Sequence, residues 1–404
     1  MYEDRIEMVR RRLLTRTGLL LLLLAGGTWL PQSPGVALAR DDETAIIRVG
    51  PTRAIKWPSE AARLATDGAI VEIDAGVYGG DVAIWTQDRL TLRGVGGLAH
   101  LEAEGKSAQG KAIWVIKGDE VVVEKIGFSG CRVPDRNGAG IRAEGRDLTI
   151  RDSLFHGNEM GILTDDRADS HIVIERSEFS RNTVDYERYG SLGHNLYIGR
   201  VASFTLSGSF VHGSHIAHNV KSRARLNRIL YNRIVDDDDS GSSYLIDLSE
   251  GGDAKVIGNS LRQSRHSANP AMISYAAEDG RRDAEANVVI ANNTFVNAAP
   301  SVRFVQNFSA SEIRFLNNLL IGGTRLVAGR ASLDGNVIAD TTSLQNPSQG
   351  DYRLVADSPA IDGGRDLGPE LRSAHEYVHP LSLRKRPVRG AIDAGAYEFN
   401  DRDS

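Results

Sequence analysis

Several common features are scarce or missing in this chain of 404 residues, and each gap excludes a class of protein. Cysteine occurs once, at Cys131, so an internal disulfide is excluded and a small, buried apolar side chain is expected there. The formal net charge is −5, which gives no reason to expect a nucleic-acid partner or a basic membrane-binding face. No zinc signature, nucleophile elbow or phosphate-binding loop is present.

Long apolar runs are also missing, apart from one segment near the N-terminus. The run Gly18–Ala25 follows three arginines, Arg10–Arg12, and precedes the small-residue site Ala37–Ala39, which is the pattern of a signal peptide. The run is too short to span a bilayer. We therefore expect residues 1–39 to direct export by the twin-arginine or the Sec route, and the product to be periplasmic or secreted without a stable membrane anchor.

One short phrase, in contrast, recurs along most of the chain. It alternates apolar and polar residues and ends in a turn, most often at Asn, Ser or Gly, which predicts a strand followed by a turn. Its copies are Leu90–Val95, Val121–Ile126, Leu148–Ser153, Ile172–Ser177, Phe204–Ser209, Asn227–Asn232, Ala254–Asn259, Val288–Asn293, Ile313–Asn318 and Ala331–Asn336. One such strand cannot bury its apolar face alone, so the copies are expected to stack around a shared core.

The period of two within each copy, the β-branched residues and the 42 glycines favour strands over a helical solenoid. We predict an all-β, single-stranded, right-handed parallel β-helix of about ten coils, since the irregular spacing fits loops of variable length. It should be one domain over residues 40–399 with a polar tail at 400–404, and a monomer is expected. The terminal asparagines of five copies should stack, with amides bonded to neighbouring coils, namely Asn232, Asn259, Asn293, Asn318 and Asn336.

The two ends of the repeat support this architecture. Pro58–Ala65 predicts a short helix with Ser59 as its N-cap, placed to cover the open end of the solenoid. Further segments resemble the pectate-lyase-like β-helix superfamily: Ile70–Tyr78, Leu90–Gly97, Asp351–Leu354, Ser358–Gly364 and Gly390–Glu398. That resemblance implies the fold, and the fold hosts lyases, hydrolases, epimerases and proteins without enzymatic activity.

Polar side chains gather in the middle of the repeat. Segments 194–199, 218–223 and 244–249 align, so Tyr197, Lys221 and Asp247 should point outward from three successive strands and form one exposed column. Asn195, Asn219 and Arg223 are expected on the same outer face. His194 and His218 should lie one above the other at the strand entrances. His212 and His215, in a loop, should overhang the same cleft.

This set of residues suits β-elimination from a uronic acid, which needs carboxylate neutralisation, a base for the C5 proton and an acid for the leaving oxygen. Val220–Asn227 is also similar to the Lys-Ser-x-x-Asn segment of the chondroitinase B and alginate lyase group, which implies that Lys221 is the base. The arginine that this group places on the next coil has no counterpart here. The expected catalytic residues are His194, Tyr197, His218, Lys221 and Arg223, and the expected substrate-binding residues are Asn195, Asn219, His215, Asp247 and Glu250.

Alternatives remain open. In one alternative, the stacked histidines have no role beyond bonding the backbone, and Lys221 and Asp247 form an ordinary cross-strand ion pair. The acidic turn Asp236–Asp239 favours solvated carboxylates over a Ca²⁺ site, and Ca²⁺ is the only cofactor that the sequence suggests. Asp247, Glu250 and Glu278 offer the carboxylates of a glycoside hydrolase. An exported lyase acting on an acidic polysaccharide is the prediction, with a C5-epimerase, a hydrolase and a non-catalytic carbohydrate-binding or structural protein as alternatives.

Overall fold

The computed structural model describes residues 44–190, 193–267, 269–278, 285–299, 303–323 and 325–400. The predicted signal peptide and the end of the predicted tail lie outside these residues. The described residues belong to one compact unit that begins at Thr44. Within the described ranges, no helix is long and apolar enough to cross a membrane.

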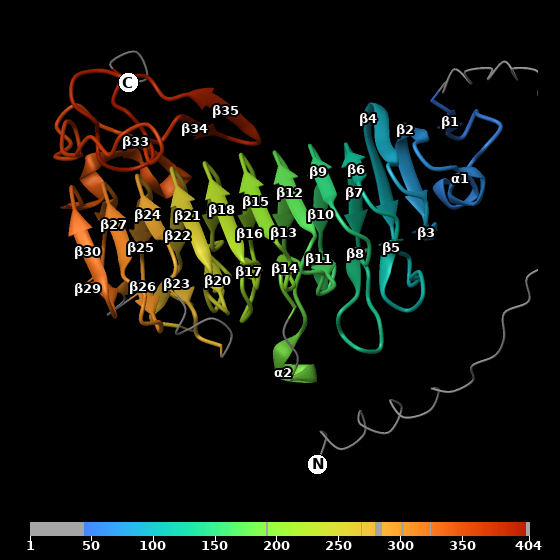
Figure 1. Ribbon diagram of the computed structural model, residues 1–404, viewed down its shortest axis with the longest axis horizontal. Coiled ribbons are helices and arrows are strands. Elements are labelled where there is room, and N and C mark those ends of the chain that lie inside the picture. The colour runs from blue at the N-terminus through green and yellow to red at the C-terminus, as the bar shows by residue number, and fades with distance from the viewer. Residues whose placement is uncertain are drawn as a thin grey trace, which may run out of the picture. The chain divides into compact units, whose positions relative to one another are not determined.

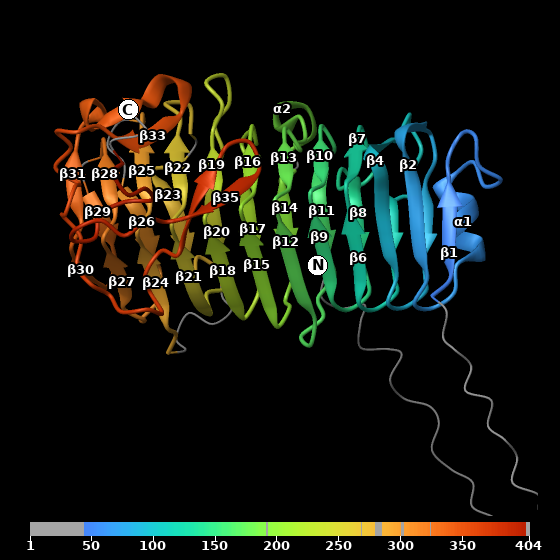
Figure 2. The same ribbon diagram turned by 90° about the horizontal axis from the view of Figure 1, so that it is seen from above.

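The strands form a parallel β-helix with three faces, seen along its length in Figure 1 and from above in Figure 2. The first two faces are halves of one 21-stranded sheet that bends at each coil. Strands of the first face are β1 (Ile46–Val49), β2 (Ile70–Gly79), β4 (Thr91–Glu102), β6 (Val121–Glu124), β9 (Leu148–Arg151), β12 (His171–Glu175), β15 (Ser203–Ser207), β18 (Leu226–Leu230), β21 (Asp253–Ile257), β24 (Val288–Ala291), β27 (Ile313–Leu316) and β30 (Ala331–Asp334).

The second face starts with the later halves of the long strands β2 and β4. It continues with β7 (Ile126–Ser129), β10 (Leu154–His156), β13 (Glu178–Ser180), β16 (Phe210–His212), β19 (Arg233–Val235), β22 (Ser260–Gln263), β25 (Thr294–Asn297), β28 (Leu319–Ile321) and β31 (Val337–Ala339). Each strand pairs in parallel with the equivalent strand of the next coil, so side chains at equivalent positions lie in columns.

The third face is a separate 10-stranded parallel sheet. Its strands are β3 (Ala83–Trp85), β5 (Ala112–Ile116), β8 (Ala139–Ala143), β11 (Met160–Thr164), β14 (Leu196–Ile198), β17 (Val220–Ser222), β20 (Ile246–Leu248), β23 (Ala271–Tyr275), β26 (Arg303–Asn307) and β29 (Arg325–Ala328). These ten strands agree with the predicted number of coils. The alternation of buried and partly exposed residues along the strands places every second side chain in the shared core, as the sequence pattern predicts.

The corner between the first two faces contains the predicted asparagine ladder. The Nδ2 of Asn259 donates to Oδ1 of Asn293 at 2.9 Å, and Oδ1 of Asn259 accepts the backbone N–H of Asn232 at 2.9 Å. The residue before each ladder asparagine is in the left-handed region, as at Tyr231 with φ 56°. The ladder therefore satisfies backbone groups that are buried away from water, and its prediction is confirmed.

The interior also stacks aromatic rings. Trp85, Trp114, Phe128, Phe155 and Phe179 form a continuous row with ring centroids 4.7–5.2 Å apart. Cys131 is buried as predicted, and burial raises the pKa of its thiol to about 12. It is therefore an inert part of the core.

The N-terminal end is covered by the helix α1 (Pro58–Leu64), as predicted, but its N-cap is Trp57 rather than Ser59. Proline lacks an N–H and is favoured at the first helical position, so Pro58 starts the helix, and Glu60 accepts the backbone N–H of Trp57 at 3.4 Å. A second short helix, α2 (Tyr186–Tyr189), lies in the loop before β14.

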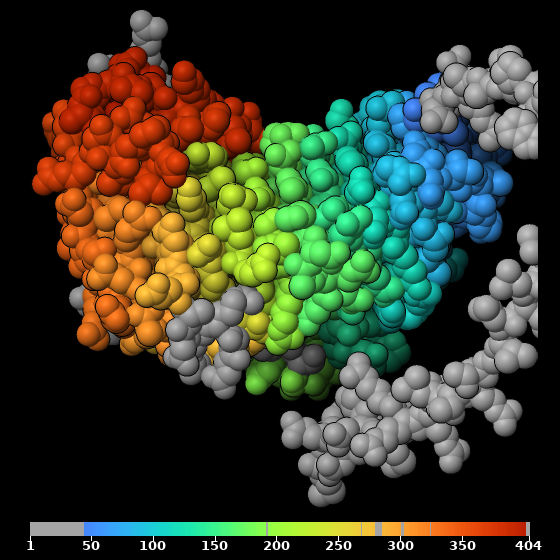
Figure 3. Space-filling model, in the orientation of Figure 1, coloured from blue at the N-terminus to red at the C-terminus, as the bar shows by residue number. Residues whose placement is uncertain are grey.

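After β31 the chain folds back over the second face and forms a lobe, which Figure 3 shows above the C-terminal half of the solenoid. We call residues 341–400 the C-terminal lobe. It contains the short helices η1 (Thr341–Ser343) and η2 (Pro347–Gln349) and two antiparallel pairs, β32 (Leu344–Asn346) with β33 (Asp351–Leu354) and β34 (His375–Val378) with β35 (Ser382–Lys385). Its apolar residues pack on outward side chains of the second face such as Leu319.

Candidate functional site

The third face brings together the three residues that the sequence placed in one column. In the parallel register, Tyr197 of β14 pairs with Lys221 of β17, and Lys221 pairs with Asp247 of β20. The Nζ of Lys221 lies 3.6 Å from Oδ2 of Asp247 and 5.8 Å from the ring centroid of Tyr197. The predicted juxtaposition is confirmed.

The predicted exposure of this column is wrong for two of its members. The side chains of Lys221 and Asp247 are only 11% and 5% exposed, and Tyr197 is half-buried. Glu278, which follows β23, covers them: its backbone N–H donates to the carbonyl of Ser249, and its side chain is 38% exposed. Strand alternation predicts which side chains point outward, but it does not predict a later coil that lies over them.

Glu278 bridges the two cations of the site. Its Oε1 accepts from Nζ of Lys221 at 2.7 Å, and its Oε2 accepts from Nε and Nη2 of Arg223 at 2.9 and 2.7 Å. Partial burial alone would raise the pKa of Glu278, but the hydrogen bonds and charges of Lys221 and Arg223 outweigh it, so the pKa is lowered. We call Lys221 and Arg223 the carboxylate cradle, since together they hold one carboxylate between three donors.

A second ion pair borders the carboxylate cradle. Glu250, whose side chain is 5% exposed, lies 3.4 Å from Nε of Arg223 and 2.5 Å from Nη2 of Arg200. The sequence reasoning named Glu250 but missed Arg200, which stands as far after Tyr197 as Glu250 stands after Asp247. That shared offset from aligned strands was the signal that could have found the pair.

Asp247 itself is almost fully enclosed. Its Oδ2 accepts from the Ser249 hydroxyl at 2.6 Å and lies 3.5 Å from Nε2 of His218. Its Oδ1 is buried and has no hydrogen-bond partner among the described residues. An unsatisfied buried carboxylate oxygen is costly, so this atom is suited to accept a hydroxyl from a bound molecule.

His194 and His218 stack as predicted, with ring centroids 5.0 Å apart, and Tyr244 extends the stack at 5.3 Å from His218. Both rings are buried, and each Nδ1 accepts a backbone N–H of the next coil, from His218 and from Tyr244 respectively. Burial lowers the pKa of His218 to about 4 and also lowers that of His194. Both imidazoles are therefore neutral, and the Nδ1 of each has a structural part, while their catalytic role stays a prediction.

Asn195 and Asn219 do not face outward, so their predicted contact with substrate is wrong. Both are fully buried, and Nδ2 of Asn195 donates to Oδ1 of Asn219 at 2.8 Å within a second asparagine ladder. The strands β14 and β17 begin one residue later, so these asparagines belong to the preceding corner, where strand alternation no longer applies. Their counterparts on the next two coils, Leu245 and Met272, are core residues.

The two loop histidines lie elsewhere. His215 is exposed and lines a pocket with Arg132, Tyr186 and Tyr189 instead of the column. His212 belongs to β16 on the second face and not to a loop over the cleft. The position predicted for His212 is therefore wrong, and its Nδ1 lies 2.9 Å from Oδ1 of Asp237 instead.

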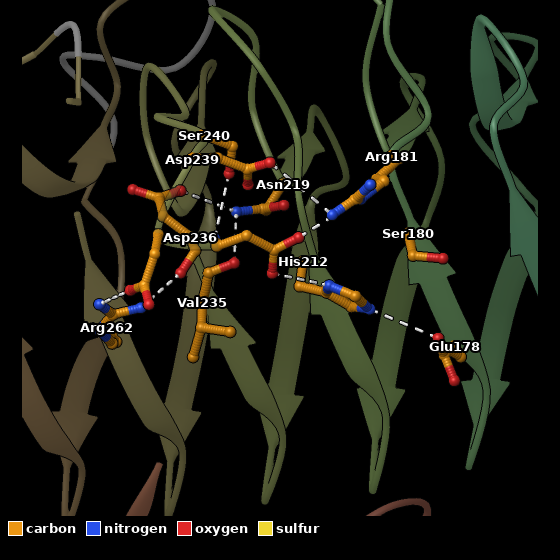
Figure 4. A network of polar contacts seen from close by, with 12 residues as sticks. Glu178, Ser180, Arg181, His212, Asn219, Val235, Asp236, Asp239, Ser240 and Arg262 are labelled. Carbon is orange, nitrogen blue, oxygen red and sulfur yellow. Dashed lines mark hydrogen bonds and ion pairs between the residues drawn. The ribbon is translucent and has the colours of Figure 1, made fainter. Parts of the chain in front are cut away.

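The acidic turn Asp236–Asp239 is shown with its partners in Figure 4. Asp236 is buried at the end of the second asparagine ladder, where its carboxylate accepts the backbone N–H groups of Ser242 and Ser264, and burial raises its pKa to about 6. The other three carboxylates lie beside cationic or imidazole groups, namely Asp237 beside His212 and Arg181, Asp238 beside Arg262, and Asp239 beside Arg181.

These partners leave the turn poorly suited to Ca²⁺, because protein cations and backbone donors already engage its oxygens. Among the residues that the structure describes, no group of three or more His, Cys, Asp or Glu side chains is placed to hold a metal ion. His212 contributes an imidazole to this network. Burial would lower its pKa, but bonds to Asp237 and Glu178 outweigh burial, and the pKa is raised.

Comparison with protein-family models finds no match, and comparison with curated proteins finds none either. Among solved structures, the crystal structure of pectate lyase Pel9A matches with a TM-score of 0.57 and 14% identity, covering 88% of this chain and 97% of that one. The deglycosylated pectin methylesterase from Aspergillus niger matches at 12% identity, with a TM-score of 0.34, over 78% of this chain and 91% of that one.

A mutant of the PL6 family alginate lyase AlyGC also matches, with a TM-score of 0.34 and 14% identity over 78% of this chain and 56% of that one. At 14% identity, the match with pectate lyase Pel9A establishes the fold and nothing finer. The chain has the pectate-lyase-like, right-handed parallel β-helix fold that its sequence predicts.

Proposed function

We propose that this protein is an exported lyase that cleaves a uronic-acid-containing polysaccharide by β-elimination at the carboxylate cradle. The observation that carries the proposal is that Lys221 and Arg223 both donate hydrogen bonds to one carboxylate, that of Glu278. A planar guanidinium and an ammonium directed at a single carboxylate form a binding site for the acid group of a uronate. Glu278 occupies the place of that group in the free protein.

Each step of the reaction has a candidate group. The uronate carboxylate displaces Glu278 and bonds to Arg223, which stabilises negative charge as it develops at C5. Once Glu278 has left, Lys221 gives its proton to solvent, and the neutral amine takes the C5 proton. The C5 electron pair forms the C4–C5 double bond, the bond from C4 to the glycosidic oxygen breaks, and Tyr197 donates a proton to that oxygen. Asp247 accepts a sugar hydroxyl on its unpartnered Oδ1.

Hydrolysis is the weaker alternative at this site. A glycoside hydrolase needs one carboxyl group with a raised pKa to protonate the leaving oxygen. Glu278 has a lowered pKa, and Glu250 is held by Arg200 and Arg223. A C5-epimerase would use the same proton abstraction but return a proton from the opposite face, and a non-catalytic protein would bind the polymer unchanged.

A product survey of the wild-type protein tests the class of reaction. We expect that incubation with alginate, pectate, glycosaminoglycans or bacterial exopolysaccharides yields unsaturated uronates, detected by their ultraviolet absorbance. New reducing ends without that absorbance would show hydrolysis. Deuterium incorporation at C5 in heavy water without chain cleavage would show epimerisation, and binding without any of these would show a carbohydrate-binding protein.

A further inference from the structure

A second polar site lies away from the column, between the C-terminal lobe and the second face. It is a pocket of about 290 Å³ lined by Arg233 of β19 and by residues of the lobe, among them Tyr352, Arg353, Tyr377 and Arg384. A neighbouring pocket of about 210 Å³ shares Arg233 and Tyr352 and adds Phe210, Arg262 and the acidic residues Asp236–Asp238, so the uronate site is assigned to the first pocket. The column on the third face contributes no residue to either lining.

Arg233 is the guanidinium of this pocket that makes no direct ion pair within the described part of the chain, although Asp351 also lines the pocket and acts on it at longer range. Arg353 is paired with Asp351 at 2.6 Å, and Arg384 is paired with Glu376 at 2.6 Å. Arg233 has no carboxylate within ion-pair distance among the described residues. Its Nη1 donates to the carbonyl of Gly350 at 3.0 Å, and its Nε is buried without a hydrogen-bond partner. A guanidinium in this state is ready to accept an anion.

The Tyr352 hydroxyl is a second buried polar group in this pocket without a hydrogen-bond partner among the described residues. Tyr352 is 1% exposed. The guanidinium carbon of Arg233 lies 5.9 Å from the Tyr352 ring and 5.4 Å from the Phe210 ring. A cation, an unpartnered hydroxyl and aromatic walls are the features that bind the carboxylate, a hydroxyl and the ring face of an acidic sugar.

We propose that this pocket binds one uronate residue, with the sugar carboxylate on Arg233 and a sugar hydroxyl on the Tyr352 hydroxyl. The ligand class rests on the proposed function, whereas the charge and the unpartnered atoms belong to the pocket itself. The competing explanation is that Arg233 only clamps the lobe. Arg233 lies so close to Gly350 that a Cβ atom added to Gly350 would be 1.9 Å from Nη2 of Arg233.

The test measures glucuronate binding by calorimetry to the Arg223→Met variant, in which the carboxylate cradle has lost its guanidinium and competes less. Adding Arg233→Met should weaken binding about tenfold or more, since a charge-assisted hydrogen bond pair is lost. Adding Tyr352→Phe should weaken it a few-fold without lowering thermal stability, because the hydroxyl has no partner to lose. Arg228→Met, at an exposed position of the first face, is the matched control and should change nothing.

Three results would overturn the proposal: glucuronate binding that survives Arg233→Met, unchanged binding in Tyr352→Phe, or acetate binding as tightly as glucuronate. The last would identify an anion hole without sugar recognition. If Arg233→Met does not fold, Tyr352→Phe decides alone. Glucuronate binding that depends on Arg233 and Tyr352, in a protein that cleaves no polymer of the product survey, would refute the lyase and leave this site standing.

Discussion

At the scale of single residues, the decisive contact is the one between Glu278 and the carboxylate cradle. Strand alternation was enough to align Tyr197, Lys221 and Asp247 from the sequence, because their copies keep the same offset from a core residue. It could not predict the cover by Glu278, which enters from the loop after β23, beyond any strand pattern.

The Glu278→Gln variant tests whether this side chain competes with substrate. Removing its charge weakens its hold on Lys221 and Arg223, so the KM for the acidic polymer should fall several-fold. Glu312→Gln, at an exposed position in a loop, is the control and should leave the KM unchanged. A KM that stays the same or rises in Glu278→Gln would show that Glu278 does not occupy the substrate carboxylate's place.

The buried histidines predict how stability changes with pH. An unfolded histidine takes up a proton below about pH 6.5, whereas burial lowers the pKa of folded His218 to about 4. The unfolded state then binds more protons, so the stability present above pH 6.5 is lost as the pH falls toward 4. For His218 alone this loss is about 3 kcal/mol.

The variant His218→Phe keeps a ring in the stack but cannot titrate. Its free energy of unfolding should be lower at neutral pH, because the Tyr244 N–H loses its acceptor, and should fall less on acidification than that of the wild type. Denaturant unfolding across the pH range measures both, with His171→Phe at an exposed position as the control for residue type. An unchanged pH slope in His218→Phe would contradict the neutral, buried imidazole.

At the scale of elements, the corners between strands were the parts of the fold that the sequence predicted least well. Strands were predictable because their apolar residues repeat every second position, and the ladder of Asn259 and Asn293 was predictable because each asparagine ends a copy. The second ladder was missed because Asn195 and Asn219 stand directly before a strand and were assigned to its outer face. A difference of one position in the sequence decides whether a side chain lies in the corner or on the outer face of the strand, and no periodicity in the sequence marks that boundary.

Asn259→Ala tests the first ladder. It removes the acceptor for the buried N–H of Asn232, so the free energy of unfolding should fall by about 1–3 kcal/mol. Asn336→Ala is the matched control, since this asparagine is only half-buried on the last coil and water can replace part of its bonds. Equal losses in thermal or denaturant unfolding would show that the ladder does not act by satisfying enclosed backbone groups.

At the scale of the whole molecule, the repeat predicted a solenoid, its helical cap and a closing segment, but not what the closing segment covers. The C-terminal lobe lies over the second face, where Leu319 and other outward residues are apolar. An outward apolar residue in a strand looks the same in sequence whether a lobe covers it or not. The pocket at Arg233 was therefore beyond prediction, since it exists only where the lobe meets the solenoid.

The central claim, that Lys221 removes the C5 proton in the carboxylate cradle, is tested most directly by Lys221→Arg. Arginine keeps a positive charge between Asp247 and Glu278 but cannot lose its proton. Lys255→Arg on the first face is the matched control. The account predicts that Lys221→Arg folds and yields no unsaturated uronate from a polymer that both the wild type and Lys255→Arg cleave. Wild-type turnover in a folded Lys221→Arg protein would contradict it.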